Sequence, residues 1–168
     1  MIVNLDSIGR ESDVDARLLS TAIDLDLPNA KVISEVGVSG RLTRHSHSIQ
    51  LDGKLLASLE IDCDRCLEPQ PLQVDIDLDL EFVGLADIAK DSSVEVISDD
   101  LNIDVAEGEI DLAEIAREQI LLDLPQQFFC SDDCKGLCIK CGSNLNLIDC
   151  NCIVKEIDPR WAALKDLN

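Results

Sequence analysis

The sequence predicts an α+β protein: an antiparallel β-sheet with one or two packing helices, followed by a zinc-stapled, cysteine-rich C-terminal segment. Three observations predict this class. Apolar and polar residues alternate through much of residues 32–82, as they do in half-buried strands. A capped helical pattern then starts at Asp111, and six of the eight cysteines lie in the last 39 residues. We therefore expect an acidic α+β domain at 1–129 and a zinc-binding tail at 130–168, with a short C-terminal helix packed on the tail.

Two stretches of alternating residues account for the expected strands. Between residues 32 and 61 apolar side chains occupy alternate positions, with an interruption at Asp52-Gly53 that is typical of a hairpin turn. The clearest strand is 74–82, where apolar residues point to one face and acidic residues to the other. The pattern therefore predicts a strand with one apolar and one acidic face.

The acidic face of strand 74–82 carries four carboxylates: Asp75, Asp77, Asp79 and Glu81. Residues i and i+2 on one face of a strand lie roughly 6.5–7 Å apart, so this row would be about 20 Å long. Arg41 and Arg44 could neutralise one or two of these charges if their strand lies adjacent. If the row is exposed instead, we expect it to be the docking face for a basic segment of a ribosomal or assembly protein.

Capping residues place the helices. Asp111 is the expected N-cap of a helix, with Glu114 at the capping-box position, and Pro125 ends that helix. Residues 87–100 are polar, and we expect a mobile loop with an edge strand there. Asp158-Pro159 predicts the start of the short C-terminal helix, because proline is favoured at the first helical position.

The eight cysteines divide into two sets of four. Zinc favours four ligands in a tetrahedron, and two thiolates three residues apart turn readily onto one ion, with Gly142 able to take the positive φ of such a turn. The simplest partition gives two sites: Cys138, Cys141, Cys150 and Cys152 in one, and Cys63, Cys66, Cys130 and Cys134 in the other. Swapped partners, with Cys63 and Cys66 joined to Cys138 and Cys141, stay open. We expect two structural zinc ions per chain, with the tail site binding more tightly.

The same cysteines do not indicate catalysis. Catalytic zinc sites keep three protein ligands, usually including histidine or a carboxylate, and leave a position for water. The two histidines, His45 and His47, lie far upstream, and we expect them to be solvent-facing strand residues. A thiol oxidoreductase built on Cys63 and Cys66 is an alternative, but Pro69 follows closely and no helix begins there to lower a thiol pKa. We therefore expect no enzymatic activity.

Composition limits the classes of function. The chain has 168 residues and is 46% hydrophobic, which is enough for a real core, and its apolar runs are too short to span a membrane. It begins without a basic segment followed by an apolar stretch, so we expect no secretory signal and a cytoplasmic location. In a reducing compartment, eight cysteines indicate metal binding rather than disulfides.

Acidic residues are concentrated in the middle of the sequence. Residues 60–124 hold 20 Asp or Glu and three basic residues, which gives −17 of the formal net charge of −20. Such a segment repels phosphate and cannot be a general nucleic-acid surface, whereas it attracts a basic partner and accelerates its association. The alternative is that the acidity serves solubility alone.

Several motifs follow one another in an order and spacing that are more specific than any single cysteine pair. They are Cys63-Asp64-Arg65-Cys66-Leu67-Glu68-Pro69, Gly108-Glu109-Ile110-Asp111-Leu112, Leu121-Leu122-Asp123-Leu124-Pro125, Cys134-Lys135-Gly136-Leu137-Cys138, Cys141-Gly142-Ser143-Asn144-Leu145-Asn146, Cys150-Asn151-Cys152 and Asp158-Pro159-Arg160. Over roughly residues 50–168 the sequence resembles the YceD-like family, the large ribosomal RNA subunit accumulation proteins of bacteria and plastids.

The resemblance implies a role in the synthesis, processing or stability of large-subunit ribosomal RNA, without a known enzymatic activity. It also implies that some family members keep the early Cys-x-x-Cys and lack the tail cluster, which favours a separate site for Cys63 and Cys66. We expect a non-enzymatic ribosome-biogenesis factor that binds a basic ribosomal or assembly protein. A membrane and a small-molecule substrate are not expected.

Direct RNA binding by a zinc protein is the alternative function. Two modest basic patches could contact ribosomal RNA: Arg41, Arg44, His45 and Lys54 in the first, and Lys135, Lys140, Lys155 and Arg160 in the second. The chain has only three phenylalanines and one tryptophan, so aromatic platforms for stacking single-stranded bases are not expected.

Overall fold

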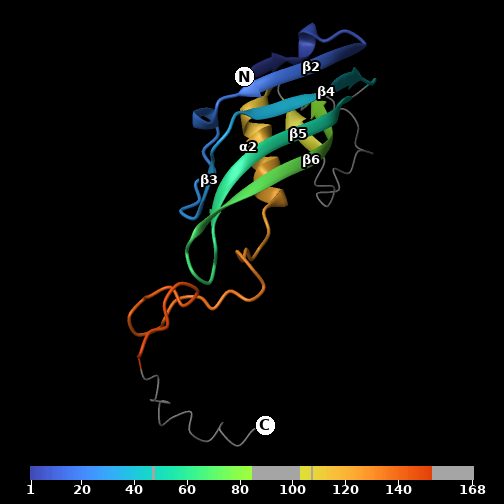
Figure 1. The fold of residues 1–168 in the computed structure, drawn as a ribbon. Coiled ribbons are helices and arrows are strands. Elements are labelled where there is room, and N and C mark those ends of the chain that lie inside the picture. The colour runs from blue at the N-terminus through green and yellow to red at the C-terminus, as the bar shows by residue number, and fades with distance from the viewer. Residues whose placement is uncertain (47, 85–102, 107, 153–168) are drawn as a thin grey trace, which may run out of the picture. The chain divides into compact units, whose positions relative to one another are not determined.

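The computed structural model describes four stretches of the chain: residues 1–46, 48–84, 103–106 and 108–152 (Figure 1). The chain divides into two units: Met1–Ile61 with Pro69–Gln126 in unit 1, and Asp62–Glu68 with Gln127–Asn168 in unit 2. Unit 2 thus combines the segment of the first cysteine pair with the tail. The division into domains 1–129 and 130–168 stays a prediction.

Most of unit 1 is β-structure. In chain order its described elements are β1 (Ile2–Asn4), the 3-10 turn η1 (Leu5–Ser7), β2 (Glu11–Leu18), the 3-10 turn η2 (Ser20–Ala22), β3 (Ala30–Val32), β4 (Val36–Arg44), β5 (Ser48–Asp62), β6 (Pro69–Gly84), β7 (Ile103–Ala106), β8 (Glu109–Asp111) and helix α2 (Leu112–Asp123). These elements confirm the predicted α+β class.

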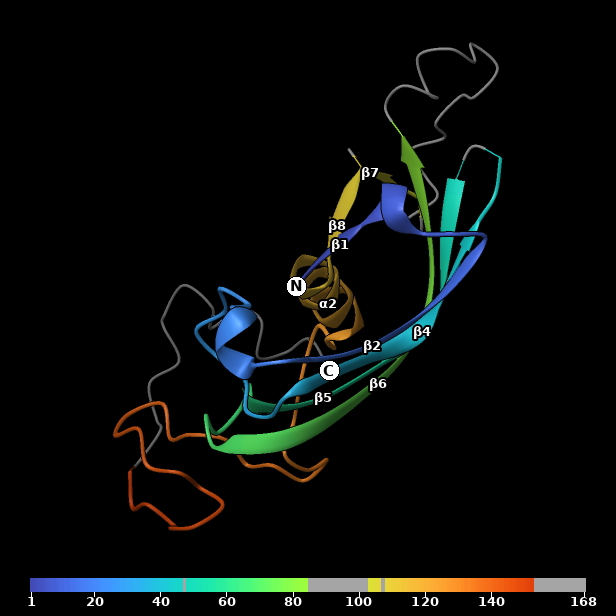
Figure 2. The same cartoon turned by 90° about the horizontal axis from the view of Figure 1, so that it is seen from above.

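The central sheet has the strand order β2-β4-β5-β6-β7, and β3 also pairs with β5. The pairs β2–β4, β4–β5 and β3–β5 are antiparallel, whereas β6 and β7 are parallel. β1 and β8 form a separate two-stranded antiparallel sheet. The central sheet curves around α2, which lies on its concave side (Figure 2). The sheet is therefore mostly antiparallel and packed by a helix, as the sequence predicts.

The alternation of apolar residues decides which side chains form the core. The largest fully buried side chains come from β4, β5, β6 and α2 and include Leu42, Leu51, Leu55, Leu59, Leu80, Leu112 and Ile120. Complete burial of one such side chain contributes about 1.5–3 kcal/mol relative to leaving it exposed. The core of unit 1 therefore lies between the concave face of the sheet and the helix.

One predicted turn is wrong. Asp52-Gly53 lies inside β5, where Gly53 is the register partner of Gly40 on β4. A Cβ added at Gly40 would lie 2.4 Å from the carbonyl oxygen of Asp52, and one added at Gly53 would lie 2.3 Å from that of Ser39. The two glycines therefore allow a close approach of two backbones inside the sheet rather than a change of chain direction. Instead, β4 ends at Arg44 and β5 starts at Ser48, and the N–H of His45 donates to the carbonyl of Ser48 at 2.8 Å.

The acidic row of β6 lies on an exposed face of the sheet. Asp75, Asp77 and Asp79 are exposed and Glu81 is half-buried, while Val74, Leu78, Leu80 and Phe82 are buried on the opposite face. The cation beside this row comes from β5: the Lys54 ammonium nitrogen lies 3.2 Å from an oxygen of Asp75 and 2.8 Å from one of Asp77. The row is thus exposed and partly neutralised by a lysine that the sequence did not single out for this contact.

The two arginines expected beside that row have other partners. The Arg41 guanidinium lies 3.0 Å from Asp13 and 3.7 Å from Glu11, both on β2. Arg44 donates hydrogen bonds to the backbone carbonyls of Leu5 and Ile8. Because β5 lies between β4 and β6, the arginines of β4 are not adjacent to the acidic row. Their partners lie on the other side of β4, away from β6.

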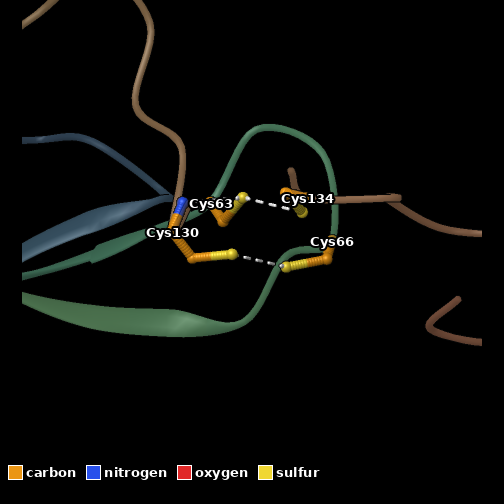
Figure 3. A group of neighbouring side chains, drawn as sticks. All are labelled: Cys63, Cys66, Cys130 and Cys134. Atoms are coloured by element: carbon orange, nitrogen blue, oxygen red, sulfur yellow. Dashed lines mark hydrogen bonds between the residues drawn. The ribbon is translucent and has the colours of Figure 1, made fainter. Parts of the chain in front are cut away.

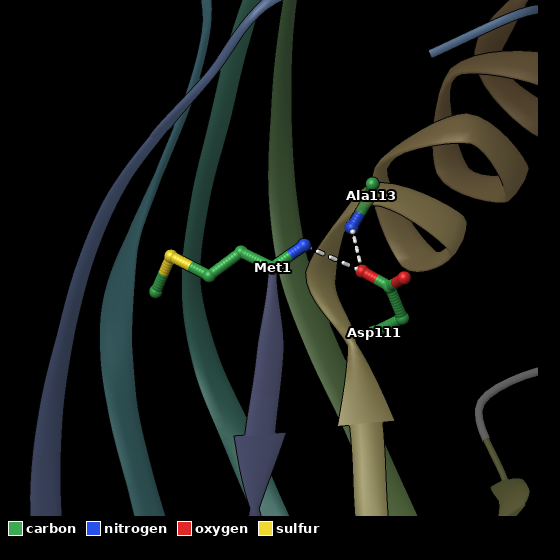
Figure 4. Close-up of polar contacts among 3 residues, drawn as sticks. All are labelled: Met1, Asp111 and Ala113. Atoms are coloured by element: carbon green, nitrogen blue, oxygen red, sulfur yellow. Dashed lines mark hydrogen bonds and ion pairs between the residues drawn. The ribbon is translucent and has the colours of Figure 1, made fainter. Parts of the chain in front are cut away.

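The predicted N-cap of α2 is confirmed. Asp111 accepts a hydrogen bond of 3.0 Å from the backbone N–H of Ala113 and one of 2.8 Å from the α-amino group of Met1 (Figure 4). The helix ends before Leu124 and Pro125, as the proline predicts. The cap thus joins the start of the helix to the first described residue of the chain.

Two predicted elements lie outside the described residues. These are the loop at residues 87–100 and the short helix that begins at Asp158-Pro159. Among the helices that the structure does describe, none combines the length and the apolar character needed to cross a membrane.

Replacing Gly40 by alanine should destabilise unit 1, whereas the same change at Gly37 of the same strand should not. A Cβ at Gly40 meets backbone atoms of β5 at 2.4 and 2.8 Å, while one at Gly37 has no heavy atom within 4 Å. We expect a loss of about 1–3 kcal/mol for Gly40→Ala and a change within about 0.5 kcal/mol for Gly37→Ala. Urea unfolding of both variants measures the difference, and equal stabilities would contradict the close approach.

Replacing Asp111 by alanine should cost about 1 kcal/mol of stability at neutral pH, because the N-cap acceptor is lost. Asp111→Asn is the matched control, since it keeps an acceptor and removes the charge. The hydrogen bond from the Met1 amino group, followed by that from Ala113, lowers the pKa of Asp111 below its usual value.

A carboxyl group whose pKa is lowered by folding contributes stability above its unfolded pKa of about 4 and loses it as the pH falls through the folded value. The deficit of Asp111→Ala relative to wild type should therefore shrink below about pH 4. Unfolding free energies measured at pH 6 and pH 3 test this. A deficit that is the same at both values would show that the carboxylate charge has no part in the cap.

Candidate metal centre

The first cysteine pair lies in a tight turn between β5 and β6. The N–H of Cys63 donates to the carbonyl of Glu68 at 3.1 Å, and the N–H of Leu67 donates to the carbonyl of Cys63 at 2.8 Å. Leu67 has a φ of 59°, in the left-handed region that favours glycine. A non-glycine residue in this region is held there by its surroundings, here by the turn that brings Cys63 and Cys66 together.

The tail repeats this turn with different residues. The N–H of Cys138 donates to the carbonyl of Ser143 at 2.8 Å, and the N–H of Gly142 donates to the carbonyl of Cys138 at 2.8 Å. Gly142 takes the predicted positive φ, with a value of 73°. Cys63–Cys66 and Cys138–Cys141 therefore form two turns with the same hydrogen-bond pattern, each presenting two sulfurs.

The first turn and the segment after α2 bring four sulfurs together (Figure 3). The sulfurs of Cys63, Cys66, Cys130 and Cys134 all lie within 4.8 Å of one another. The Cys63–Cys134 distance is 3.8 Å and the Cys66–Cys130 distance is 3.7 Å. Four zinc–sulfur bonds of about 2.3 Å in a tetrahedron place the sulfurs about 3.8 Å apart, whereas a disulfide needs about 2.05 Å. This set, which we call site 1, fits a tetrahedral metal ion.

The remaining four cysteines form a second set, which we call site 2. The sulfurs of Cys138, Cys141, Cys150 and Cys152 also lie within 4.8 Å of one another. Cys138 is buried, Cys141 is exposed and the other two are half-buried, whereas three of the four cysteines of site 1 are buried. The structure thus groups the cysteines as in the simplest partition of the sequence, and the swapped pairing is not adopted. Each set could hold one metal ion.

Backbone and side-chain donors favour the thiolate form that a metal requires. Burial alone would raise the pKa of Cys63, but N–H groups, including that of Cys130 at 3.4 Å from its sulfur, lower this pKa to about 6. In site 2 the Ser143 hydroxyl lies 3.3 Å from the sulfur of Cys141 and is the largest cause that lowers the pKa of Cys141 to about 6. In each set these donors lower the pKa of some thiols, whereas burial and the neighbouring sulfurs raise the pKa of Cys66 in site 1 and of Cys152 in site 2.

Contacts around site 1 hold its two segments together. The N–H of Asp64 donates to the carbonyl of Phe128 at 2.9 Å, and the N–H of Phe128 donates back to the Asp64 carboxylate at 2.8 Å. Arg65 lies over the ring of Phe129, 4.2 Å from its centroid, and donates to the carbonyl of Cys134 at 3.2 Å. Sequence reasoning missed these supporting residues, because their partners are more than 60 positions away and no local pattern joins them.

The histidine that the structure describes, His45, does not contribute to either set. His45 is exposed just after β4, and His47 lies outside the described residues. Four thiolates fill the tetrahedron of an ion and leave no position for a reactive water, which is the arrangement of structural metal sites. The geometry therefore supports a structural role, in which a metal ion cross-links segments of the chain.

Comparison with known proteins identifies relatives over most of the chain. Residues 51–168 match the family described as "Large ribosomal RNA subunit accumulation protein YceD". A chloroplast protein of Zea mays named "Large ribosomal RNA subunit accumulation protein YCED homolog 1" is 31% identical over 157 residues, which cover 79% of this chain and 54% of that protein. Its Arabidopsis thaliana namesake is 28% identical, over 79% of this chain and 48% of that protein.

A bacterial relative is similar over more of its own length. The Bacillus subtilis uncharacterized protein YlbN is 31% identical over 137 residues, which cover 80% of this chain and 75% of that protein. In contrast, the chain spans about half the length of the two chloroplast relatives. No solved structure matches the chain.

Proposed function

The chain belongs to the YceD family of large ribosomal RNA subunit accumulation proteins, and we propose that it is a non-enzymatic ribosome-biogenesis factor. In this role it supports the synthesis, processing or stability of large-subunit ribosomal RNA in the cytoplasm. The observation that carries the proposal is the family match, which includes both cysteine sets, β6 and α2. The names of the maize and Arabidopsis relatives support the same process.

Zinc is the metal that we propose for both sites, in a structural role. Its preference for four thiolates at about 2.3 Å in a tetrahedron agrees with sulfur–sulfur distances of 3.7 and 3.8 Å in site 1. A closed site of this kind contributes folding energy rather than catalysis. This supports a protein that acts by presenting a surface, and the absence of an open coordination position supports the non-enzymatic assignment.

The acidic face of the sheet supports a basic protein as the partner. On β6 the cation that the described part of the chain places against the exposed aspartates is Lys54, which contacts Asp75 and Asp77. Asp79 accepts a hydrogen bond from the neutral amide of Gln50 at 3.1 Å, so its charge is not cancelled by that contact. An extended segment with Lys or Arg at every second position has a repeat of roughly 6.5–7 Å, which matches the spacing of the row.

A hollow beside this row adds an apolar contact for such a segment. It has a volume of about 360 Å³ and is lined mostly by polar residues (Ser34, Glu35, Ser58, Gln73 and Asp75), with Leu56, Ala57 and Val74 as its apolar part. Leu56 is 51% exposed on the same side of the sheet as the aspartates. The stem of a lysine or arginine can cover such an apolar surface while its charge reaches a carboxylate.

Charge favours a protein over RNA as the direct partner. In the described part of unit 2, residues 62–68 and 127–152 contain six acidic and three basic residues. RNA affinity depends largely on neutralising phosphates with basic residues, which this segment does not offer in excess. We therefore propose that any contact with ribosomal RNA is indirect.

The untagged protein should contain two zinc ions per chain. Cys66→Ser should remove the ion of site 1 and Cys141→Ser that of site 2, because each variant leaves the other set of four intact. Metal analysis of the wild type and both variants tests the sites separately. One ion in the wild type would reject one site, and none would reject zinc binding altogether.

The partner should be identifiable by purification of the chain under native conditions. A basic ribosomal or assembly protein should co-purify, with an association that weakens steeply as salt rises to physiological strength, where the screening length falls to about 8 Å. Recovery of an RNA species that survives removal of co-purifying proteins would favour direct RNA binding instead.

Changing Asp77 and Asp79 together to lysine should abolish that association without unfolding the chain, because exposed substitutions rarely cost much stability. The matched control is Asp132→Lys with Asp133→Lys, which makes the same charge change at exposed positions of unit 2. Unchanged affinity and salt dependence for the Asp77 and Asp79 variant would reject the acidic row as the docking face.

A further inference from the structure

The loop that joins the two halves of site 2 also contacts site 1. Residues 142–149 connect Cys141 to Cys150, both ligands of site 2 in the proposed arrangement. From this loop the side-chain amide of Asn146 donates a hydrogen bond of 3.3 Å to the sulfur of Cys134, which belongs to site 1. One residue of the site 2 loop therefore contacts a sulfur of the other site.

The orientation of the Asn146 amide is fixed by its other contacts. Its oxygen accepts a hydrogen bond of 2.8 Å from the backbone N–H of Lys135. Its nitrogen, besides the contact with Cys134, donates to the side-chain oxygen of Asn144 at 2.9 Å. Because the N–H of Lys135 needs an acceptor, the amide oxygen faces that group and the amide nitrogen faces the sulfur.

The same loop contacts the other segment of site 1. Asn144 donates from its side chain to the Glu68 carboxylate at 3.2 Å, and Glu68 closes the turn that holds Cys63 and Cys66. The N–H of Leu145 donates to the carbonyl of Gly136 at 2.9 Å, next to the segment of Cys134. The loop thus braces both segments that supply the sulfurs of site 1.

We propose that Asn146 is a positioning residue through which an ion at site 2 strengthens metal binding at site 1. With Cys141 and Cys150 as ligands of one ion, the loop between them would be closed, which would lower the entropy cost of holding Asn146 against Cys134. An N–H donor beside a thiolate ligand orients the sulfur, and such outer partners typically change metal affinity about 10–100-fold. This inference rests on the proposal that both sets bind zinc.

Cadmium-113 NMR and competition with a chelator, both on the full chain, test the inference. The wild type should give one cadmium resonance per site, assigned with Cys66→Ser and Cys141→Ser. Asn146→Asp keeps the acceptor for Lys135 but places a carboxylate oxygen against the sulfur. We expect it to shift the site 1 resonance and to weaken zinc binding there about 10–100-fold.

Two further variants test whether the effect of Asn146→Asp comes from the lost hydrogen bond, from the added charge or from a general loosening of unit 2. Asn146→Ala removes the donor without adding charge and should also weaken site 1. Asn146 is exposed, so neither substitution opens a cavity. Gln127→Glu, the same amide-to-carboxylate change at an exposed position of unit 2, should leave both resonances and affinities unchanged.

The coupling itself is tested by a double-mutant comparison. Emptying site 2 with Cys150→Ser and Cys152→Ser should weaken site 1 in the wild type, and should weaken it much less when Asn146 is already alanine. Full additivity of the two changes, or unchanged site 1 affinity in Asn146→Asp, would overturn the proposal. A wild type that binds no metal would overturn both this inference and the zinc assignment.

Discussion

Convergence of four sulfurs on one point is the constraint on which unit 2 depends. The described residues of this unit form no helix, and outside the end of β5 their β pairing is the single bridge between Leu137 and Asn144. Apart from one glycine, the buried residues in the described part of unit 2 are all cysteines: Cys63, Cys66, Cys134 and Cys138. Such a segment lacks the apolar core that stabilises a larger domain, so metal binding and folding are expected to be one process.

Unit 1 depends instead on an apolar core. One face of its sheet is buried, and the other face is exposed to solvent and carries charged residues. The sheet curves around α2 and buries leucines of β4, β5 and β6, and the strand period of two then fixes which residues face solvent. Between Asp75 and Glu81 of β6 the residues on this solvent-facing side are all acidic, and Lys54 contacts two of them. Core packing thus decides where the acidic row lies. Its negative charge is the property on which the proposed binding of a basic partner depends.

Local patterns of residues predicted much of this structure, and long-range contacts explain what they missed. The cap at Asp111 and the faces of β6 depend on neighbouring residues and were predictable. The division of the cysteines into two sets of four was predictable from the four ligands of a tetrahedral metal site, but the sequence left open which pairs join, and the structure supplies that grouping. The turn predicted at Asp52-Gly53 failed, because a glycine needed for close contact with Gly40 has the same sequence signal as a turn glycine. Asn146 stands in one of the motifs that carry the family resemblance, but its role was not predictable, because it depends on a contact with another segment of the chain.

We propose that both cysteine sets bind metal as closed sites of four thiolates. X-ray absorption at the zinc K-edge of the full chain, and of Cys66→Ser and Cys141→Ser to isolate each site, tests it most directly. We expect four sulfur scatterers at about 2.3 Å around each zinc ion and no lighter ligand. A nitrogen or oxygen scatterer in the wild-type first shell would contradict it, because the site would then be open or would recruit a residue outside the two sets.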